Sequence, residues 1–330
     1  MKIAFFDTKP YDTVEFAPLA ERYGYEMKYF EHRLNADTAP LAAGYDVACV
    51  FVGDTLDAPV IEQLAGNGVG LAALRCAGYN NVDLRAAWEK LKIVRVPAYS
   101  PAAVAEHAMA LLLCLNRKLH RAYNRTRDNN FNINGFLGFD LRGKTAGVVG
   151  AGRIGRIFME VCRGFGMHVL VYDPKPSPGG DVAFVSPEEL YTRSDIISLH
   201  CPLTPDTHYM IGRDSLSRMK PGVLLINTSR GGLIDTDSLI EALKSGRVGG
   251  AGLDVYEEEE GYFFEDHSNR FVDDDDLARL LTFPNVLLTS HQGFFTREAM
   301  HAIAETTMEN VRAYMQGRPL ENEVCWKCPN

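Results

Sequence analysis

The stretch Thr145-Ala-Gly-Val-Val-Gly150-Ala-Gly152-Arg-Ile-Gly155 decides the fold of this chain. It joins a short apolar strand to three glycines spaced as GxGxxG, and a helical pattern follows over residues 156–165. In such a turn the first glycine permits a tight bend, the second lets backbone approach a pyrophosphate, and the third lets the helix lie close to the strand. Unpaired N–H groups at the start of the helix then face the phosphates. The stretch predicts a dinucleotide-binding turn. A glycine turn with a purely structural role is the alternative.

An acidic residue stands where this kind of turn requires one. Asp173 ends the next predicted strand, 168–172, and lies 18 residues after Gly155. A carboxylate at this place accepts hydrogen bonds from the hydroxyls of an adenosine ribose and repels a 2′-phosphate. The sequence therefore predicts NAD rather than NADP as the ligand of the turn.

Short β-branched runs alternate with helical patterns along most of the chain, which predicts parallel sheets in α/β layers. A first round of strands is expected at 3–6, 26–30, 47–51, 70–74 and 93–96. A second round is expected at 145–150, 168–172, 196–199, 223–227, 250–255 and 286–289. A long helix from Pro101 to about Arg121, and then a loop or arm through Gly138, should separate the two rounds. A last helix is expected over about 297–315.

The chain has 330 residues, and a domain takes roughly 150, so we expect two doubly wound parallel-sheet domains. Residues 101–298 are predicted to form a Rossmann NAD-binding domain. Because the chain beyond the last strand is free to return to the first round, a substrate domain is predicted from residues 1–100 and 299–330. That domain would be discontinuous in sequence.

The composition argues against several classes of protein. The net charge of −9, from 43 acidic and 34 basic residues, disfavours bulk affinity for nucleic acid or an anionic membrane. The basic group in residues 117–127 is interpreted as a solvated face or a subunit contact. With no signal peptide and no apolar run of 18 residues, we expect a soluble, cytoplasmic protein.

The seven cysteines are an odd number, and most lie in apolar runs that are typical of reduced core thiols. The exception is Cys325-Trp-Lys-Cys328 near the C-terminus. A redox-active CxxC needs a helix N-terminus, and a zinc site normally needs another pair of ligands. Neither context is visible, so we interpret the tail as an inert end and predict no metal site.

Side chains that follow strands of the second round are candidates for chemistry, because ligands bind beyond the carboxyl ends of parallel strands. Of nine histidines, only His200 and His291 occupy such positions. Arg230 also follows a strand and could bind a carboxylate at two points, although a partnership with a neighbouring acid is the alternative. His107 and His120 fall in the long helix and are interpreted as packing or interface residues.

Five ordered strings resemble the D-isomer-specific 2-hydroxyacid dehydrogenase family. They are the glycine turn 150–155, His200-Cys-Pro-Leu-Thr, Asn227-Thr-Ser-Arg-Gly, Gly252-Leu-Asp-Val-Tyr-Glu and Thr289-Ser-His-Gln-Gly-Phe. The similarity runs from residue 2 to about 322. Residues 73–83 and 94–108 resemble the fermentative D-lactate dehydrogenases in particular. The resemblance implies a flavodoxin-like substrate domain and an active site in the cleft between the domains.

The resemblance also implies roles for individual residues. Arg230 matches a substrate-binding arginine, Glu259 a catalytic carboxylate and His291 a proton donor. Glu259 is one of four consecutive glutamates, and only its place five residues after Asp254 selects it. Cofactor contacts are implied for Gly150, Gly152, Arg153, Ile154, Gly155, Asp173, Cys201, Pro202, Thr207, Thr228, Ser229, Arg230 and Asp254. Substrate contacts are implied for the backbone of Ala77 and Gly78 and for Tyr99, Arg230 and Phe294, with Phe51 as a further pocket wall.

These roles together imply reduction of pyruvate to D-lactate with NADH. A charged His291 would give a proton to the carbonyl oxygen, Arg230 would stabilise it, and Glu259 would favour the charged imidazole. Two alternatives stay open: a dehydrogenase for a bulkier 2-oxo acid such as phenylpyruvate, and a non-enzymatic, NAD-bound co-regulator. Phosphoglycerate dehydrogenases match less well. The helix from Pro101 resembles the family's subunit contact, so we expect a homodimer, with a tetramer left open.

Overall fold

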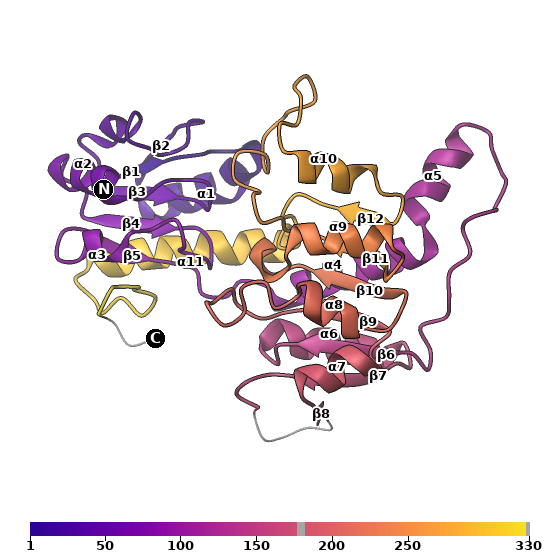
Figure 1. The fold of residues 1–330 in the computed structure, drawn as a ribbon. Helices are drawn as coiled ribbons and strands as arrows, with labels where there is room; N and C mark the ends of the chain where they lie inside the picture. Colours follow the sequence, from indigo (N-terminus) through magenta and orange to yellow (C-terminus); the bar gives the residue numbers. More distant parts are fainter. Residues whose placement is uncertain (177–181, 328–330) are drawn as a thin grey trace. The chain divides into compact units, whose positions relative to one another are not determined.

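The protein forms two compact units in a computed structural model that describes residues 1–176 and 182–327 (Figure 1). One unit comprises Met1–Ser100 with Phe295–Asn330, and the other comprises Pro101–Phe294. The second boundary lies at Phe295 rather than at the expected residue 299. The Thr296 side chain accepts a hydrogen bond from Ala299 N–H and caps the helix that follows.

The discontinuous unit is built on a parallel sheet of five strands. Their order is β2-β1-β3-β4-β5, which is the flavodoxin-like order. The strands are β1 (Lys2–Phe5), β2 (Glu26–Tyr29), β3 (Val47–Val50), β4 (Leu71–Leu74) and β5 (Lys92–Val94). All residues of β3 and β4 are buried, as expected for central parallel strands that are covered on both faces.

The helices of this unit come from both of its segments. They are α1 (Pro10–Tyr23), α2 (Ala58–Gly66), α3 (Leu84–Ala87) and α11 (Arg297–Met315), with a 3-10 turn η1 (Ala39–Ala42). Helix α11 lies against α1 and β4. Beyond it the chain pairs with the sheet edge, where Val324 N–H donates to Ile93 O at 2.9 Å. The C-terminal segment is therefore part of the first unit's fold.

The second unit contains a parallel sheet of seven strands in the order β12-β11-β10-β9-β6-β7-β8. The strands are β6 (Thr145–Val149), β7 (His168–Tyr172), β8 (Ala183–Phe184), β9 (Ile196–Leu199), β10 (Val223–Asn227), β11 (Val248–Leu253) and β12 (Val286–Leu288). The order reverses between β6 and β9, as in a Rossmann domain. The expected fold class of two doubly wound parallel-sheet domains is confirmed.

Helices cover both faces of the second sheet. They are α4 (Pro101–Arg117), α5 (Leu119–Arg127), α6 (Arg153–Gly164), α7 (Pro187–Arg193), α8 (Arg213–Arg218), α9 (Thr236–Lys244) and α10 (Asp275–Thr282), with a 3-10 turn η2 (Gly231–Leu233). Side chains of β10 alternate between two cores, since Leu224 and Ile226 join the cluster beneath α4 and α6, whereas Val223 and Leu225 join the other. A double-sided core of this kind holds the strand ends in fixed register.

The long helix predicted from Pro101 to about Arg121 is wrong in its second part. Helix α4 ends at Arg117, Lys118 takes a left-handed backbone with φ +52°, and α5 begins at Leu119. A left-handed L-residue interrupts an α-helix. Residues 128–144 contain neither helix nor strand, in agreement with the predicted arm.

Two sequence-level expectations concern properties other than the fold. Within residues 1–176 and 182–327, no helix has the length and apolar character needed to cross a membrane, and the cytoplasmic location stays a prediction. Cysteines 49, 76, 114, 162 and 201 are free thiols. Cys325 is disulfide-bonded, which the sequence did not predict, and Cys328 lies outside the described residues.

Candidate active site

The glycine turn after β6 has the shape that its spacing predicts. Gly150 has φ +100°, and a side chain there would collide with the carbonyl of His200. A side chain at Gly155 would collide with the carbonyl of Gly150. Gly152 is the N-cap residue before α6 and offers no side-chain cap, and within the described chain a Cβ on it would have no neighbour within 4 Å. The turn therefore leaves the helix N–H groups open to an anionic ligand.

Asp173 follows β7 and is tied to this turn. One of its carboxylate oxygens accepts a hydrogen bond from Ala151 N–H at 2.7 Å, and the other accepts one from Lys175 N–H at 2.8 Å. The pairing of β6 with β7 places the two segments side by side. A negative charge is thus fixed beside the glycine turn, where it can accept hydrogen bonds from a ribose.

The loops after β9 and β10 supply further polar groups. Thr207 donates its hydroxyl to Pro202 O at 2.7 Å, and Ser229 donates its hydroxyl to Leu199 O at 2.8 Å. Burial raises the pKa of the Cys201 thiol to about 11, so this side chain stays neutral. The hydroxyl of Thr228 is buried and has no hydrogen-bond partner in residues 1–176 and 182–327. An unsatisfied buried hydroxyl, an open helix end and a glycine cradle are features that fit a dinucleotide.

Three side chains of the predicted catalytic set follow three adjacent strands. Arg230 comes after β10, Glu259 after β11 and His291 after β12. Because the strands are parallel, these residues share the carboxyl edge of the sheet. The guanidinium of Arg230 donates to Ser229 O at 2.6 Å, and Asn227 donates its side-chain amide to Arg230 O at 2.8 Å. These contacts fix the turn that carries the arginine.

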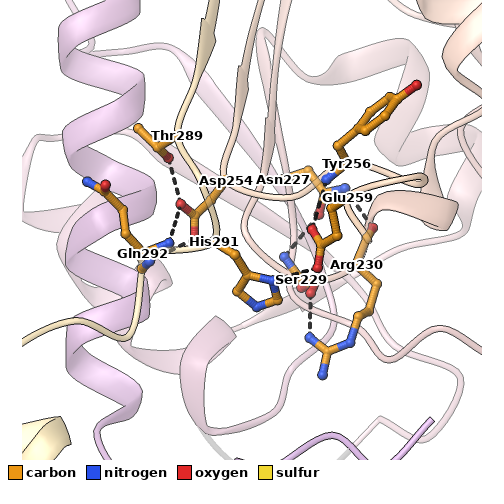
Figure 2. Close-up of polar contacts among 10 residues, drawn as sticks. Asn227, Ser229, Arg230, Asp254, Tyr256, Glu259, Thr289, His291 and Gln292 are labelled. Atoms are coloured by element: carbon orange, nitrogen blue, oxygen red, sulfur yellow. Dashed lines mark hydrogen bonds and ion pairs between the residues drawn. The ribbon is translucent and has the colours of Figure 1, made fainter. Parts of the chain in front are cut away.

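His291 and Glu259 are in direct contact. The distance between His291 Nδ1 and Glu259 Oε1 is 2.7 Å, and Figure 2 shows the imidazole directed at the carboxylate. The other oxygen of Glu259 accepts a hydrogen bond from Tyr256 N–H at 3.2 Å. Since Nδ1 faces the carboxylate, the second ring nitrogen, Nε2, is the atom left for a substrate. The pair is suited to general acid–base chemistry.

The run of four glutamates is not uniform, as the structure shows. Of the three neighbours of Glu259 in this run, Glu258 and Glu260 are exposed to solvent. Glu257 is half-buried, and burial raises the pKa of its carboxyl group. Glu259 differs from the other three because it bonds to His291.

His200 is unsuited to donate protons near neutral pH. Burial lowers the pKa of its imidazole to about 3, and its Nε2 lies 2.9 Å from the hydroxyl of Ser198. The ring also lies against Phe158, with centroids 4.9 Å apart. A neutral, buried histidine supports the choice of His291 as the acid.

Asp254 is predicted to contact the cofactor, but both oxygens of its carboxylate accept hydrogen bonds from other residues of the protein. The residue is only 1% exposed, and its side chain accepts hydrogen bonds from the Thr289 hydroxyl and from the backbone N–H groups of Gln292 and Gly293 (Figure 2). Its backbone carbonyl accepts the N–H of His291 at 2.7 Å. Asp254 therefore organises the loop that carries His291, and its contact with a cofactor stays a prediction.

In the first unit, Ala77 and Gly78, whose backbone is predicted to contact the substrate, lie in a tightly held turn after β4. The guanidinium of Arg95 donates to Ala77 O at 2.8 Å and also lies over the ring of Tyr79. Within the described residues, the backbone N–H groups of Ala77 and Gly78 donate no hydrogen bond to the protein. The turn thus presents two free donors, which is what a carboxylate requires.

The three aromatic side chains predicted to enclose the substrate belong to different units. Phe51 and Tyr99 lie in the discontinuous unit, whereas Phe294 lies in the second. Phe51 and Phe294 are each 8% exposed, and Arg75 lies over the ring of Phe51. Their common pocket and the cleft between domains stay predictions.

Two residues that support the site were not identified from the sequence. His107 was interpreted as a packing or interface residue, but its Nε2 lies 3.2 Å from the carboxylate of Asp254. Arg95 was not singled out, although it supports the Ala77 turn. The signal that could have found His107 is a polar residue on a helix face that is otherwise apolar. No comparable signal marks Arg95.

Comparisons with known proteins agree with this geometry. Residues 109–293 match the family described as "D-isomer specific 2-hydroxyacid dehydrogenase, NAD binding domain". The D-lactate dehydrogenase of Escherichia coli (strain K12) is 47% identical, with 98% of this chain and 100% of that protein covered. The 2-hydroxyacid dehydrogenase homolog 1 of Schizosaccharomyces pombe is 51% identical over 94% of this chain and 95% of that protein. A solved structure of the pyruvate reductase of Chlamydomonas reinhardtii is 45% identical, with a TM-score of 0.93 and 98% of each chain covered.

Proposed function

Since this chain belongs to the D-isomer specific 2-hydroxyacid dehydrogenase family, we propose that it reduces pyruvate to D-lactate, with His291 as the proton donor. The chain is an NAD-dependent oxidoreductase, and its second unit includes the family's NAD-binding domain. The observation that carries the proposal is the 2.7 Å contact between His291 Nδ1 and Glu259 Oε1, on strand ends next to that of Arg230.

The residues of the glycine turn fit the cofactor. Gly150, Gly152 and Gly155 would hold the pyrophosphate against the start of α6, and Asp173 would accept the ribose hydroxyls. Thr228 has a buried hydroxyl that a bound dinucleotide could satisfy. When bound, the reduced nicotinamide supplies the hydride that forms the new C–H bond of the product. Further contacts are proposed for Arg153, Ile154, Cys201, Pro202, Thr207, Ser229, Arg230 and Asp254.

The protein's own groups handle the negative charge that develops on the carbonyl oxygen. His291 Nε2 would donate a proton to that oxygen, while Glu259 holds Nδ1 and stabilises the imidazolium. Arg230 would stabilise the same oxygen and the substrate carboxylate. The protonated ring is the active form for reduction, and the neutral ring is the active form for oxidation of the 2-hydroxy acid.

The substrate carboxylate needs donors besides Arg230. The free N–H groups of Ala77 and Gly78 are proposed to supply them, on a turn that Arg95 holds in place. We also propose that Phe51, Tyr99 and Phe294 close around a methyl group, which favours pyruvate over phenylpyruvate. The names of two relatives, a D-lactate dehydrogenase and a pyruvate reductase, support pyruvate as the substrate.

A homodimer is proposed as the functional assembly. The arm after α5 exposes large apolar side chains, with Phe131 74%, Ile133 80% and Leu137 90% exposed. Apolar surface of this kind is typical of a contact with another chain. Sedimentation velocity on the full chain tests the proposal, and a monomer at micromolar concentration would contradict it.

Steady-state assays with a panel of 2-oxo acids test the proposed reaction. Pyruvate, 2-oxobutyrate, 4-methyl-2-oxopentanoate and phenylpyruvate should each be assayed with NADH and with NADPH. We expect the highest kcat/KM for pyruvate with NADH. A higher kcat/KM for phenylpyruvate would assign a bulkier substrate, and absence of turnover with all four acids would overturn the proposed activity.

A further inference from the structure

His107 packs against the loop that carries His291, although the two residues are far apart in the sequence. It projects from α4, and its Nε2 is 3.1 Å from the hydroxyl of Thr289 and 3.2 Å from Oδ1 of Asp254. The contact with Thr289 joins residues 182 positions apart. The His107 side chain is 18% exposed and that of Asp254 is 2% exposed, so solvent screens the pair weakly.

The hydrogen-bond partners determine where the proton on His107 lies. Thr289 donates its hydroxyl proton to Asp254 Oδ1, over a distance of 2.6 Å. An ionised carboxylate can only accept, and the hydroxyl proton of Thr289 is already used. His107 Nε2 must therefore carry a proton, which it shares between the hydroxyl oxygen of Thr289 and Asp254.

The Asp254 carboxylate connects this histidine to the candidate active site. Gln292 N–H donates to Oδ1 at 2.9 Å, and Gly293 N–H donates to Oδ2 at 2.7 Å. These two residues follow His291 directly. The backbone N–H of His291 donates a hydrogen bond to Asp254 O. The backbone of His291 adopts a left-handed conformation with φ +51°, which is uncommon for a residue other than glycine. The loop thus needs its hydrogen bonds to keep the imidazole in place.

The neighbours of Gly293 show how closely the loop of His291 packs against Asp254 and His107. A Cβ at this position would lie 2.9 Å from Asp254 Oδ2 and 3.4 Å from His107 Cδ2. The loop backbone, the carboxylate and the imidazole of His107 therefore touch one another. Burial alone would raise the pKa of Asp254, but hydrogen bonds from His107 and Thr289 lower it below its ordinary value.

We propose that His107 is a positioning residue for the reaction, which donates a hydrogen bond through Nε2 to Asp254 and Thr289 and thereby fixes the loop of His291. The inference rests on the proposed function in that the held imidazole is the proton donor. We assign His107 no contact with the substrate or the cofactor. Its loss should affect the rate of the chemical step more than the binding of either ligand.

Three single variants test this role. His107→Leu removes the donor, and His107→Gln restores an amide donor on a side chain of similar reach. His120→Leu is the matched control, because His120 lies in the neighbouring helix α5 and its ring nitrogen contacts the thiol of Cys114 instead. For each, amide hydrogen exchange should be measured over residues 286–294, together with kcat, KM for pyruvate and the Kd of NADH.

For His107→Leu we expect exchange at residues 291–293 to rise by at least about tenfold, as for loss of one hydrogen bond to a charged group. We expect kcat to fall by up to ~10²-fold through misplacement of the acid, with the Kd of NADH within about twofold of the wild-type value. His107→Gln should recover most of both effects, and His120→Leu should match the wild type. In a Thr289→Val background the effect of His107→Leu should be clearly smaller, since both side chains act through Asp254.

Wild-type exchange and kcat in His107→Leu would overturn the proposal. So would an equal rise in exchange across β6 and α6, because that pattern means general destabilisation. The proposed reaction can fail separately, if the wild-type protein reduces none of the 2-oxo acids. The exchange measurements would still decide whether His107 holds the loop. If His107→Leu misfolds, the same measurements on His107→Gln and Thr289→Val decide the question.

Discussion

The contact between Glu259 and His291 predicts a defined loss of activity when the carboxylate is removed. The two atoms are 2.7 Å apart, and the side chains are only 20% exposed for His291 and 27% for Glu259. Glu259→Gln keeps the size of the side chain and removes its charge. Nδ1 then loses a charged hydrogen-bond acceptor, and the positive charge of the ring loses the carboxylate that faces it.

The size of the effect follows from the kind of bond. A hydrogen bond to a charged group contributes about 1.5–3 kcal/mol. Because 1.36 kcal/mol corresponds to a factor of ten in rate, its complete loss would lower kcat/KM by about 10- to 100-fold. The Gln amide oxygen still accepts from Nδ1, so we expect a loss near the lower end, of about tenfold.

The measurement is kcat/KM for pyruvate with NADH at one pH and one ionic strength, for the wild type and three variants. Glu258→Gln and Glu260→Gln are the controls, since both side chains are exposed and solvent screens their charges. Their kcat/KM values should stay within about twofold of the wild-type value. Equal losses in all three variants would mean that the acidic run acts as a diffuse field, and the assignment of Glu259 would then be withdrawn.

Three further predictions concern the other parts of the site. Arg230→Lys should lower kcat/KM for pyruvate by ~10²-fold or more, because an ammonium lacks the planar two-point contact, and retention of activity in steady-state assays would argue against that contact. Asp173→Ala should narrow the preference for NADH over NADPH, and an unchanged ratio of kcat/KM values would assign the preference to another residue. His200 has a folded-state pKa of about 3, well below its unfolded value, so the unfolded state takes up a proton first as the pH falls below about 6.5. Denaturant titrations should therefore show a smaller loss of stability between about pH 6 and pH 4 in His200→Gln than in the wild type, and equal losses would refute the buried neutral state.

Much of the fold is predictable from the sequence because the strands are short apolar runs with clear boundaries. The predicted strands 196–199 and 223–227 and the last helix agree with the structure to the residue. The break at Lys118 was missed, since a single left-handed residue leaves no mark on hydrophobic periodicity. Strand β8 was missed because it has only two residues. The local hydrophobic pattern thus predicts helices and strands, but it does not predict a change of backbone direction at a single residue.

The candidate site is predictable to a smaller extent. Strand ends alone point to His200, Arg230 and His291, because ligands bind at the carboxyl edge of a parallel sheet. Selecting Glu259 from four glutamates required a family resemblance, and the structure supplies the physical criterion, namely its bond to His291. The half-buried state of Glu257 and the contact of His107 with Asp254 depend on segments that meet only in the folded chain.

The turnover of pyruvate by His291→Asn with NADH tests whether His291 is the proton donor. If His291 donates the proton, kcat should fall by ~10²–10⁴-fold, the usual contribution of positioned acid catalysis. The Kd of NADH, measured by fluorescence, should stay near the wild-type value, because the glycine turn and Asp173 are unchanged. A His291→Asn variant that reduces pyruvate at the wild-type rate would contradict the assignment of this histidine as the proton donor.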